Sequence, residues 1–207
     1  NIIYVLTTIL IITIFFRLYK KESRGNNWKW KNKINLQIGI QKLIKKKKIA
    51  IIGLGYVGLP LAIEFSKKFS TIGYDKNKIR IEELKNGYDS TMEIRKGDLK
   101  KSSIKFTGKK ENIADCNIYI ISVPTPVDKF NVPNMDALAS ASKLVGSILK
   151  KHDIVIYEST VYPGATEEFC VPILSRSSGL LFNKDFFCGY SPERINPGDK
   201  KHNLRNI

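Results

Sequence analysis

The chain is poor in cysteine and holds no cysteine pair at metal-binding or redox spacing. Its 207 residues include three cysteines, Cys116, Cys170 and Cys188. None of them forms the Cys-x-x-Cys pattern of zinc sites and thioredoxin-like motifs, so we expect no metal centre and no disulfide exchange. An odd number of cysteines suits a reducing compartment, and we expect all three to be reduced thiols buried in the core.

Acidic residues are almost absent from the first 48 positions. This stretch holds 12 Lys or Arg and a single acid, Glu22, in a chain whose net charge is +16. Most of the basic excess therefore belongs to an N-terminal extension. Residues 28–31 interleave Trp and Lys, but no recognised nucleic-acid-binding motif accompanies them. We interpret them as a solvated basic linker and expect no nucleic-acid partner.

Charge is missing altogether from residues 2–16. A membrane-spanning helix needs about 20 apolar residues, so this run is short. The sequence does not begin with Met, and its first Met is Met92, which suggests a longer original segment. Basic residues from Arg17 onward would then place the rest of the chain in the cytoplasm. Two interpretations stay open, a membrane anchor or a spurious upstream extension over residues 1–47; a signal peptide is disfavoured because no small-residue cleavage site follows.

Glycine, by contrast, is concentrated where an apolar run ends. Residues Ile49–Ile52 lead into Gly53-x-Gly55-x-x-Gly58, and an amphipathic helical pattern follows. A strand, a glycine turn and a helix in this order are typical of a dinucleotide site, where a pyrophosphate lies against bare backbone at a helix N-terminus. The pattern therefore predicts a dinucleotide cofactor.

An acid follows the second short apolar run of this unit. Asp75 lies 17 residues after Gly58, where a carboxylate accepts hydrogen bonds from the adenosine ribose hydroxyls and repels a 2′-phosphate. This favours NAD over NADP. The basic residues Lys76, Lys78 and Arg80 weaken that preference, since a cation here can serve a phosphate.

Strands alternate with helices over the rest of the chain, which predicts βαβ units and a parallel sheet. The fold class expected for residues 48–207 is α/β: a Rossmann-like, doubly wound sheet in the order 3-2-1-4-5-6, with helices on both faces. We expect helices over residues 77–86, from an N-cap at Asn134, and from Pro163-Gly164 to about Ser177. The expected strands are residues 49–52, 71–74, 104–107, 118–123, 154–157 and 186–190.

Polar and proline-rich segments follow three of these strands. They are Val123-Pro-Thr-Pro126, Ser159-Thr160 and Tyr190-Ser-Pro-Glu193. Ligands of open α/β sheets bind at the carboxyl ends of the strands, so we expect chemistry there. Taken alone, Ser159 or Thr160 could equally be a helix N-cap, and Glu193 with Arg194 a surface ion pair.

Four motifs together resemble the UDP-glucose/GDP-mannose dehydrogenase family. They are Gly53-Leu-Gly-Tyr-Val-Gly-Leu-Pro60, Val123-Pro-Thr-Pro126, Glu158-Ser-Thr-Val-Tyr-Pro-Gly164 and Ser191-Pro-Glu-Arg-Ile-Asn-Pro-Gly198. The amino-acid sequences of the last two motifs are most similar to those of the branch that acts on UDP-N-acetylhexosamines. The UDP-glucose branch usually has Glu where this chain has Pro197.

The resemblance implies an NAD-dependent oxidation of a sugar C6 alcohol to a uronic acid, through a thiohemiacetal and a thioester on a cysteine, for polysaccharide synthesis. It implies a UDP-sugar substrate and a homodimer when the protein is complete. Thr160 would orient water or the reacting centre, and Glu193 would act near the sugar as acid, base or binding group. The residues implied to hold NAD are Gly53, Gly55, Tyr56, Val57, Gly58, Asp75, Arg80, Pro124, Thr125, Ser159 and Thr160.

One element of the family pattern does not occur in this sequence. The nucleophile of the family lies in a Gly-Gly-x-Cys-x-Pro segment, and none of the three cysteines matches it. We therefore expect the chain to comprise the cofactor half without the dimer-forming helix or the UDP-sugar domain, to bind NAD weakly and to oxidise nothing alone. A stand-alone NAD-binding module, an inactive gene fragment and a UDP-glucose 6-dehydrogenase remain the alternatives.

Overall fold

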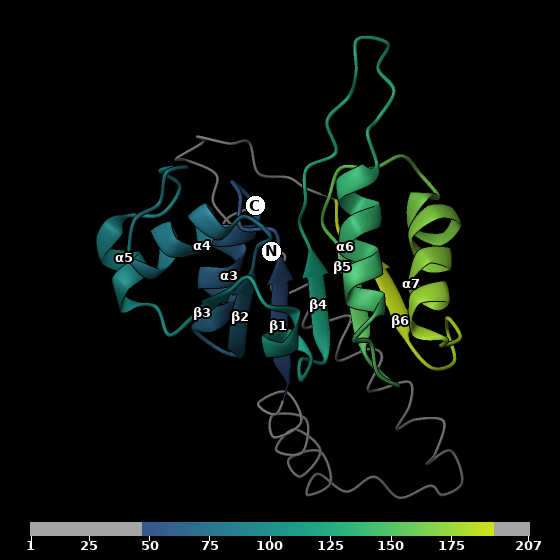
Figure 1. Ribbon diagram of the computed structural model, residues 1–207, viewed down its shortest axis with the longest axis horizontal. Helices are drawn as coiled ribbons and strands as arrows, with labels where there is room; N and C mark the ends of the chain where they lie inside the picture. Colours follow the sequence, from purple (N-terminus) through teal and green to yellow (C-terminus); the bar gives the residue numbers. More distant parts are fainter. Residues whose placement is uncertain (1–46, 193–207) are drawn as a thin grey trace, which may run out of the picture.

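A six-stranded parallel sheet organises the part of the chain that the computed structural model describes, residues 47–192 (Figure 1). Its order is β3-β2-β1-β4-β5-β6, which confirms the predicted order and the Rossmann-like fold class. The strands are β1 (Lys48–Ile52), β2 (Ser70–Tyr74), β3 (Lys105–Thr107), β4 (Ile118–Ile121), β5 (Ile154–Tyr157) and β6 (Phe187–Tyr190). The expected membrane anchor and Glu193 lie outside the described residues.

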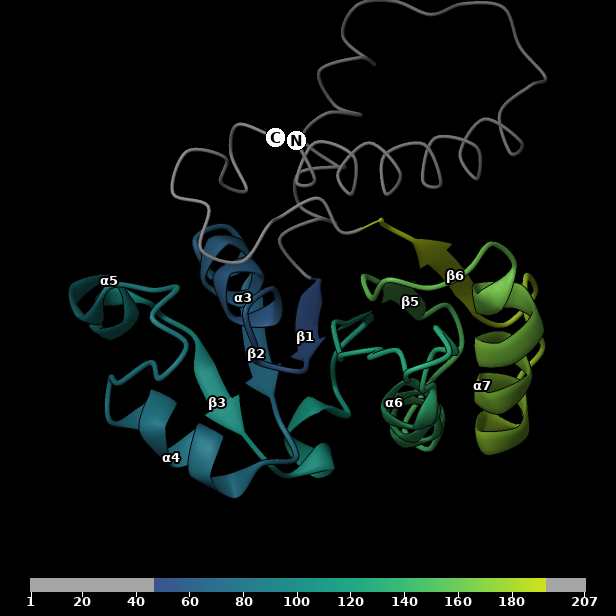
Figure 2. The same cartoon turned by 90° about the horizontal axis from the view of Figure 1, so that it is seen from above.

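Helices cover both faces of the sheet (Figure 2). Helix α3 lies on one face, and α6 and α7 lie on the other, while α4 and α5 flank the β3 end. Within residues 47–192, no helix has the length and apolar character needed to cross a membrane. The helices are α3 (Gly58–Ser66), α4 (Lys78–Lys85), α5 (Lys96–Lys101), α6 (Asp136–Gly146) and α7 (Val171–Ser178), with a 3₁₀ turn η1 (Lys110–Ile113) and a π-helical turn η2 (Thr166–Cys170).

The residues of the central strand β1 explain why helices must cover both faces of the sheet. Ile49 and Ile51 belong to the core cluster under α3, whereas Ala50 and Ile52 belong to the cluster under α6 and α7. Successive side chains of a strand point to opposite faces, so a run that is apolar at every position must be buried on both. The continuous apolar run that predicted a buried strand therefore has its expected structure.

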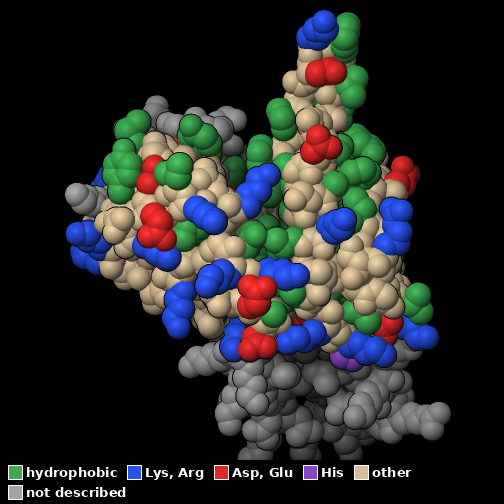
Figure 3. All heavy atoms as spheres, in the orientation of Figure 1, with side chains coloured by type: hydrophobic (Ala, Val, Ile, Leu, Met, Phe, Trp, Pro, Cys, Tyr) green, Lys and Arg blue, Asp and Glu red, His purple; other side chains and the backbone are tan. Residues whose placement is uncertain are grey.

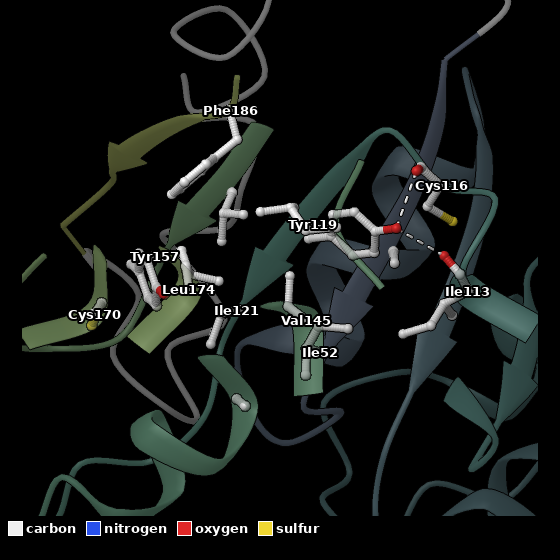
Figure 4. Packing of buried hydrophobic residues seen from close by; sticks show 14 of the residues in the cluster. Ile52, Ile113, Cys116, Tyr119, Ile121, Val145, Tyr157, Cys170, Leu174 and Phe186 are labelled. Carbon is white, nitrogen blue, oxygen red and sulfur yellow. Dashed lines mark hydrogen bonds between the residues drawn. The ribbon is translucent and has the colours of Figure 1, made fainter. Parts of the chain in front are cut away.

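Two tyrosine hydroxyl groups inside the core cluster under α6 and α7 are hydrogen-bonded. The Tyr119 hydroxyl donates to the carbonyl oxygens of Ile113 and Cys116, at 3.2 and 3.1 Å (Figure 4). The Tyr157 hydroxyl pairs with the Ser142 hydroxyl at 2.8 Å. Each tyrosine thus fills the core with its ring without leaving its hydroxyl unsatisfied, as buried polar groups require.

The starts of two expected helices, and the burial of one cysteine, differ from what the sequence predicts. Asn134 is not the N-cap of α6: Met135 holds that position, although the Asn134 side chain accepts from the N–H of Asp136 at 2.8 Å. The helix expected from Pro163 starts instead with the π-helical turn η2 and becomes α-helical at Val171. Cys188 is only half-buried, because β6 is the edge strand of the described sheet.

A proline-containing segment projects beyond the carboxyl end of β4 (Figure 1). An antiparallel bridge between Val127 and Pro133 closes it. The side chains of Val127, Phe130 and Val132 are exposed along it. Figure 3 shows hydrophobic side chains on this projection. The segment therefore stands on the same edge of the sheet as the predicted site.

Candidate functional site

The glycine turn follows β1, which lies between β2 and β4 in the sheet. Strands β2 and β3 are added on one side of β1, and β4, β5 and β6 on the other. Gly53 follows β1 with φ +94°, a conformation that favours glycine. Its N–H donates to the carbonyl of Tyr74 at 2.9 Å. A Cβ at Gly53 would come 2.4 Å from the carbonyl oxygen of Ser122, which follows β4. The turn is therefore held between two strand ends, and only glycine fits it.

Gly58 and Gly55 differ in what surrounds them. A Cβ at Gly58 would come 1.9 Å from the carbonyl oxygen of Gly53, so the start of α3 packs directly on the turn. Among residues 47–192, nothing lies within 4 Å of where a Cβ at Gly55 would be. Gly58 is thus required by the protein itself, whereas the space over Gly55 is open to a ligand.

The backbone between these glycines offers unused donors. Among residues 47–192, the N–H groups of Gly55, Tyr56 and Val57 donate to no protein acceptor. The first turn of α3 contains no acidic residue, and Val57 caps it without a side-chain hydrogen bond. Free N–H groups and the positive end of a helix are the features that bind a phosphate. The geometry therefore fits the pyrophosphate of a dinucleotide.

Asp75 follows β2 and contacts the same turn. Its Oδ2 accepts from the N–H of Leu54 at 2.9 Å, and its Oδ1 accepts from the N–H of Asn77 at 2.8 Å. The half-buried carboxylate thus lies beside the glycine turn, in the position expected from the sequence. Each carboxylate oxygen has two lone pairs, so the group can still accept from two ribose hydroxyls.

Arg80 contacts the carbonyl of Leu54, the residue whose N–H donates to Asp75. The environment of Arg80 could not be predicted from the sequence. Its Nε donates to the carbonyl of Leu54 at 2.9 Å, and its Nη2 donates to Asp89 at 2.7 Å. Both side chains are buried. Although burial alone would raise the pKa of Asp89, hydrogen bonds from Thr91, Ile94 and Arg80 hold that pKa below its usual value. Asp89 is therefore ionised at neutral pH and neutralises the guanidinium.

Leu54 itself was missed by the sequence analysis. Its side chain is fully buried under the sheet, while its backbone accepts from Arg80 and donates to Asp75. A Cβ at Gly73 of β2 would come 3.0 and 3.1 Å from the two methyl groups of Leu54. The one available signal was therefore Gly73, a glycine in the middle of an expected strand, which marks a close approach.

The exits of β4 and β5 are joined by hydroxyl groups. The Ser159 hydroxyl donates to the carbonyl of Val123 at 2.7 Å and accepts from the N–H of Val123 at 3.1 Å. The Thr125 hydroxyl donates to the carbonyl of Thr160. Neither Ser159 nor Thr160 is a helix N-cap, because the next helical turn begins at Thr166 after Ala165. The alternative capping role is therefore wrong.

The side chains expected to act on substrate are only partly described. Thr160 is exposed at the end of β5, and Pro124 is exposed in the segment after β4. The N–H of Ser191 donates to the carbonyl of Tyr157 at 2.9 Å, which brings the exit of β6 beside that of β5. The predicted residues of β1, β2, β4 and β5 thus share one edge of the sheet, and Glu193 lies two residues past the last exit.

Residues 47–207 match the family described as UDP-glucose/GDP-mannose dehydrogenase family, NAD binding domain. The UDP-N-acetyl-D-glucosamine 6-dehydrogenase of Salmonella typhi is 59% identical over 165 residues, which are 79% of this chain and 39% of that protein. The enzyme of the same name from Pseudomonas aeruginosa is 56% identical over 165 residues and the same shares. The chain thus spans about two fifths of the length of these curated relatives.

Solved structures show the same fold. The UDP-D-ManNAc dehydrogenase of Pyrococcus horikoshii superimposes with a TM-score of 0.67 at 32% identity, over 73% of this chain and 37% of that one.

Proposed function

Because the chain belongs to the UDP-glucose/GDP-mannose dehydrogenase family, we propose that it is the cofactor-binding portion of an NAD-dependent nucleotide-sugar 6-dehydrogenase. The observation that carries the proposal is the turn at Gly53–Gly58, with its unused N–H groups, its open space over Gly55 and the carboxylate of Asp75 beside it. The family match to an NAD-binding domain gives the cofactor as NAD.

The residues proposed to hold NAD fall into three groups by chemistry. Backbone N–H groups of Gly55, Tyr56 and Val57 receive the pyrophosphate. Asp75 accepts from the adenosine ribose hydroxyls. The segment Pro124-Thr125 and the pair Ser159-Thr160 line the exits of β4 and β5, where the nicotinamide end lies in an open α/β sheet.

Bound NAD supplies the hydride acceptor for oxidation of an alcohol. Around it, we propose that Thr160, which is exposed at the end of β5, orients water or the sugar C6 group, and that Glu193 exchanges a proton there or binds the sugar. The cysteines described here are unsuited to nucleophilic work, since burial raises the pKa of Cys116 and Cys170 to about 11 and that of Cys188 to about 12. The thioester-forming thiol must therefore be another residue.

The proposed substrate is a UDP-N-acetylhexosamine. The most similar relatives reported above carry UDP-N-acetyl-D-glucosamine in their names, and Pro197 departs from the UDP-glucose branch. We also propose that the whole protein is a homodimer and serves polysaccharide synthesis. We further propose a domain boundary at residue 47, with the preceding residues as an appendage; carbonate washing of membranes checks whether that appendage is an anchor.

A chimera tests the proposal. Residues 47–207 replace the equivalent part of the Salmonella typhi enzyme, and NADH formation is followed by absorbance with UDP-N-acetyl-D-glucosamine. We expect turnover, and we expect Glu193→Gln and Thr160→Val to lower kcat by roughly 10²-fold, the usual contribution of acid–base and positioning groups. The matched control, Lys151→Ala, changes an exposed residue at the opposite edge of the sheet and leaves kcat unchanged.

Two results contradict the proposal. A folded chimera that reduces no NAD supports the stand-alone module instead. NADH formation from a UDP-sugar by residues 1–207 alone contradicts the expectation that this chain lacks the nucleophile.

A further inference from the structure

Lysine side chains gather along the edge of the sheet at which the strands begin, opposite the candidate site. Five of the six strands begin at a lysine or within three residues after one. The strands are parallel, so these residues share one edge. Figure 3 shows Lys and Arg side chains along the lower margin of the molecule, below the amino ends of the strands. We call this surface the basic edge, and its exposed lysines include Lys48, Lys68, Lys105, Lys150, Lys151 and Lys184.

Few carboxylates neutralise the basic edge. The Nζ atom of Lys150 lies 3.1 Å from Asp115, and that of Lys151 lies 3.4 Å from Asp185. Within residues 47–192, the other four lysines named above form no salt bridge. A third acid near the strand starts, Asp153, is 2% exposed and is therefore withdrawn from the surface. The basic edge thus keeps a net positive charge.

The candidate site lies at the other end of the strands. Strand β1 has five residues, so at ~3.3 Å per residue it separates the two edges by about 16 Å. Interactions between exposed charges are screened over about 8 Å at physiological ionic strength. The lysines of the basic edge are therefore too far from the glycine turn to serve a pyrophosphate bound there, and their anionic partner is a different one.

The sequence before β1 favours a membrane as that partner. Lys48 opens β1, and the basic run extends upstream through Lys45. Farther upstream, residues 2–16 carry no charge. A basic cluster that follows an apolar segment is typical of proteins that bind anionic lipid head groups. A weak apolar anchor alone holds a protein at a bilayer only reversibly, and a polybasic surface supplies the second signal.

The other side chains near the strand starts suit a lipid surface better than a single-stranded nucleic acid. Leu181 is 57% exposed, and its carbonyl accepts from the N–H of Lys184 at 3.3 Å, so an apolar side chain accompanies a lysine in one turn. Single-stranded nucleic acids bind by stacking on exposed aromatic side chains. Within residues 47–192, such side chains occur at other places in the chain and none lies in the ten residues before a strand: Tyr56, Tyr88, Phe130, Tyr162 and Tyr190.

We propose that the basic edge is a peripheral contact surface for membranes rich in anionic phospholipids. Its lysines lie against the lipid head groups, and Leu181 adds an apolar contact at the same surface. The glycine turn at the opposite edge then faces away from the bilayer and stays open to cofactor and substrate. This inference does not depend on the proposed NAD site.

Cosedimentation of the whole chain with vesicles tests the proposal, at about 0.15 M salt, where screening is physiological. One set of vesicles is phosphatidylcholine alone, and the other also contains phosphatidylglycerol. The edge variant removes three lysines that form no salt bridge, by Lys68→Gln, Lys105→Gln and Lys184→Gln. The matched control removes the same charge from exposed positions at the carboxyl edge, by Lys76→Gln, Lys78→Gln and Lys129→Gln.

We expect the unchanged chain to bind the anionic vesicles and the edge variant to bind them at least tenfold more weakly. Each lysine at an anionic surface contributes roughly fivefold to the affinity. The control should stay within about twofold of the unchanged chain, because its lysines lie beyond the screening distance. Thermal unfolding checks that both variants are folded.

Lysine acetylation read by mass spectrometry locates the contact in the unchanged chain, and so decides the question even where a variant does not fold. Anionic vesicles should slow the acetylation of Lys68, Lys105 and Lys184 several-fold. Lys129, at the tip of the projection beyond β4, should react as fast as without vesicles.

Four results overturn the proposal. They are no binding to the anionic vesicles, equal loss of affinity in the folded edge variant and the folded control, equal protection of the lysines at both edges, and equally strong binding to phosphatidylcholine alone. The last would mean that an apolar anchor acts without the lysines. A DNA duplex that protects the basic edge, where anionic vesicles do not, would assign this surface to a nucleic acid instead.

Discussion

Gly58 packs so closely on Gly53 that a Cβ on Gly58 would come 1.9 Å from the carbonyl oxygen of Gly53. The contact joins the first residue of α3 to the turn that follows β1. It sets the distance between the N-terminus of α3 and the end of β1, and this distance shapes the turn that carries the unused N–H groups of Gly55 and Val57. The fold and the candidate site therefore depend on the same pair of residues.

We expect Gly58→Ala to destabilise the domain. The methyl group would overlap a backbone carbonyl that cannot rotate away, so α3 must shift from the sheet. Overpacking of this kind costs about 1–3 kcal/mol. Urea unfolding followed by circular dichroism measures the loss, with Gly97→Ala as control because a Cβ there meets no described residue within 4 Å. Equal stability of the two variants would contradict the packing described here.

Stability should depend on pH through Asp153. Burial is the largest influence on its carboxyl group and raises its pKa from 3.8 to about 6. A raised pKa means that the folded state binds the proton more tightly, so the stabilisation is complete below about pH 4 and disappears as the pH rises through about 6. Asp153→Asn removes this dependence.

The free energy of unfolding of Asp153→Asn, relative to the unchanged protein, should therefore rise between about pH 4 and about pH 7 by on the order of 3 kcal/mol. Denaturant titrations across this range measure it, with the exposed Asp98→Asn as control. A difference that stays constant or falls with pH would rule out a raised pKa.

The three thiols should react slowly in the folded protein. Burial raises the pKa of Cys116 and Cys170 to about 11 and that of Cys188 to about 12, so little thiolate exists at neutral pH. We expect Ellman's reagent to label all three only after unfolding in guanidinium. A thiol that reacts in the native protein as fast as free cysteine would contradict the raised pKa values, and that cysteine would then be a candidate nucleophile.

Ser159→Ala should destabilise the edge that carries the site. The hydroxyl is buried and makes two hydrogen bonds to the backbone of the partly buried Val123. Loss of such bonds costs about 1 kcal/mol. Ser147→Ala is the control, because that hydroxyl is exposed at the C-cap of α6. Should Ser159→Ala lose NAD affinity without any loss of stability, the hydroxyl serves the cofactor rather than the strand exits.

The strand order could be predicted because it depends on local patterns. Apolar runs such as Ile49–Ile52 and Ile118–Ile121 mark strands buried on both faces, and helical segments between them allow only parallel pairing. The glycine turn and Asp75 could be predicted for the same reason, since their spacing follows from one βαβ unit. The structure places Asp75 at the turn, as expected.

The environment of Arg80 could not be predicted. Asp89 and Thr91 lie in a segment without helical or strand periodicity, and their contact with Arg80 depends on how that segment folds back over α4. The hydrogen bonds of Ser159 could not be predicted either, because its partner Val123 is 36 residues away in the sequence. Contacts of this kind arise from tertiary packing, which cannot be predicted from local sequence patterns.

The central claim is that a pyrophosphate occupies the open space over Gly55. The most direct measurement is calorimetric titration of NAD into the unchanged chain and into Gly55→Ala, with unfolding curves for both. In the part of the chain that the structure describes, a Cβ there has no neighbouring atom within 4 Å, so stability should change by less than about 0.5 kcal/mol. NAD affinity should nevertheless fall by roughly tenfold or more, because the methyl group displaces the phosphates from their N–H donors. Equal NAD affinity of the two proteins, both folded, would contradict the account.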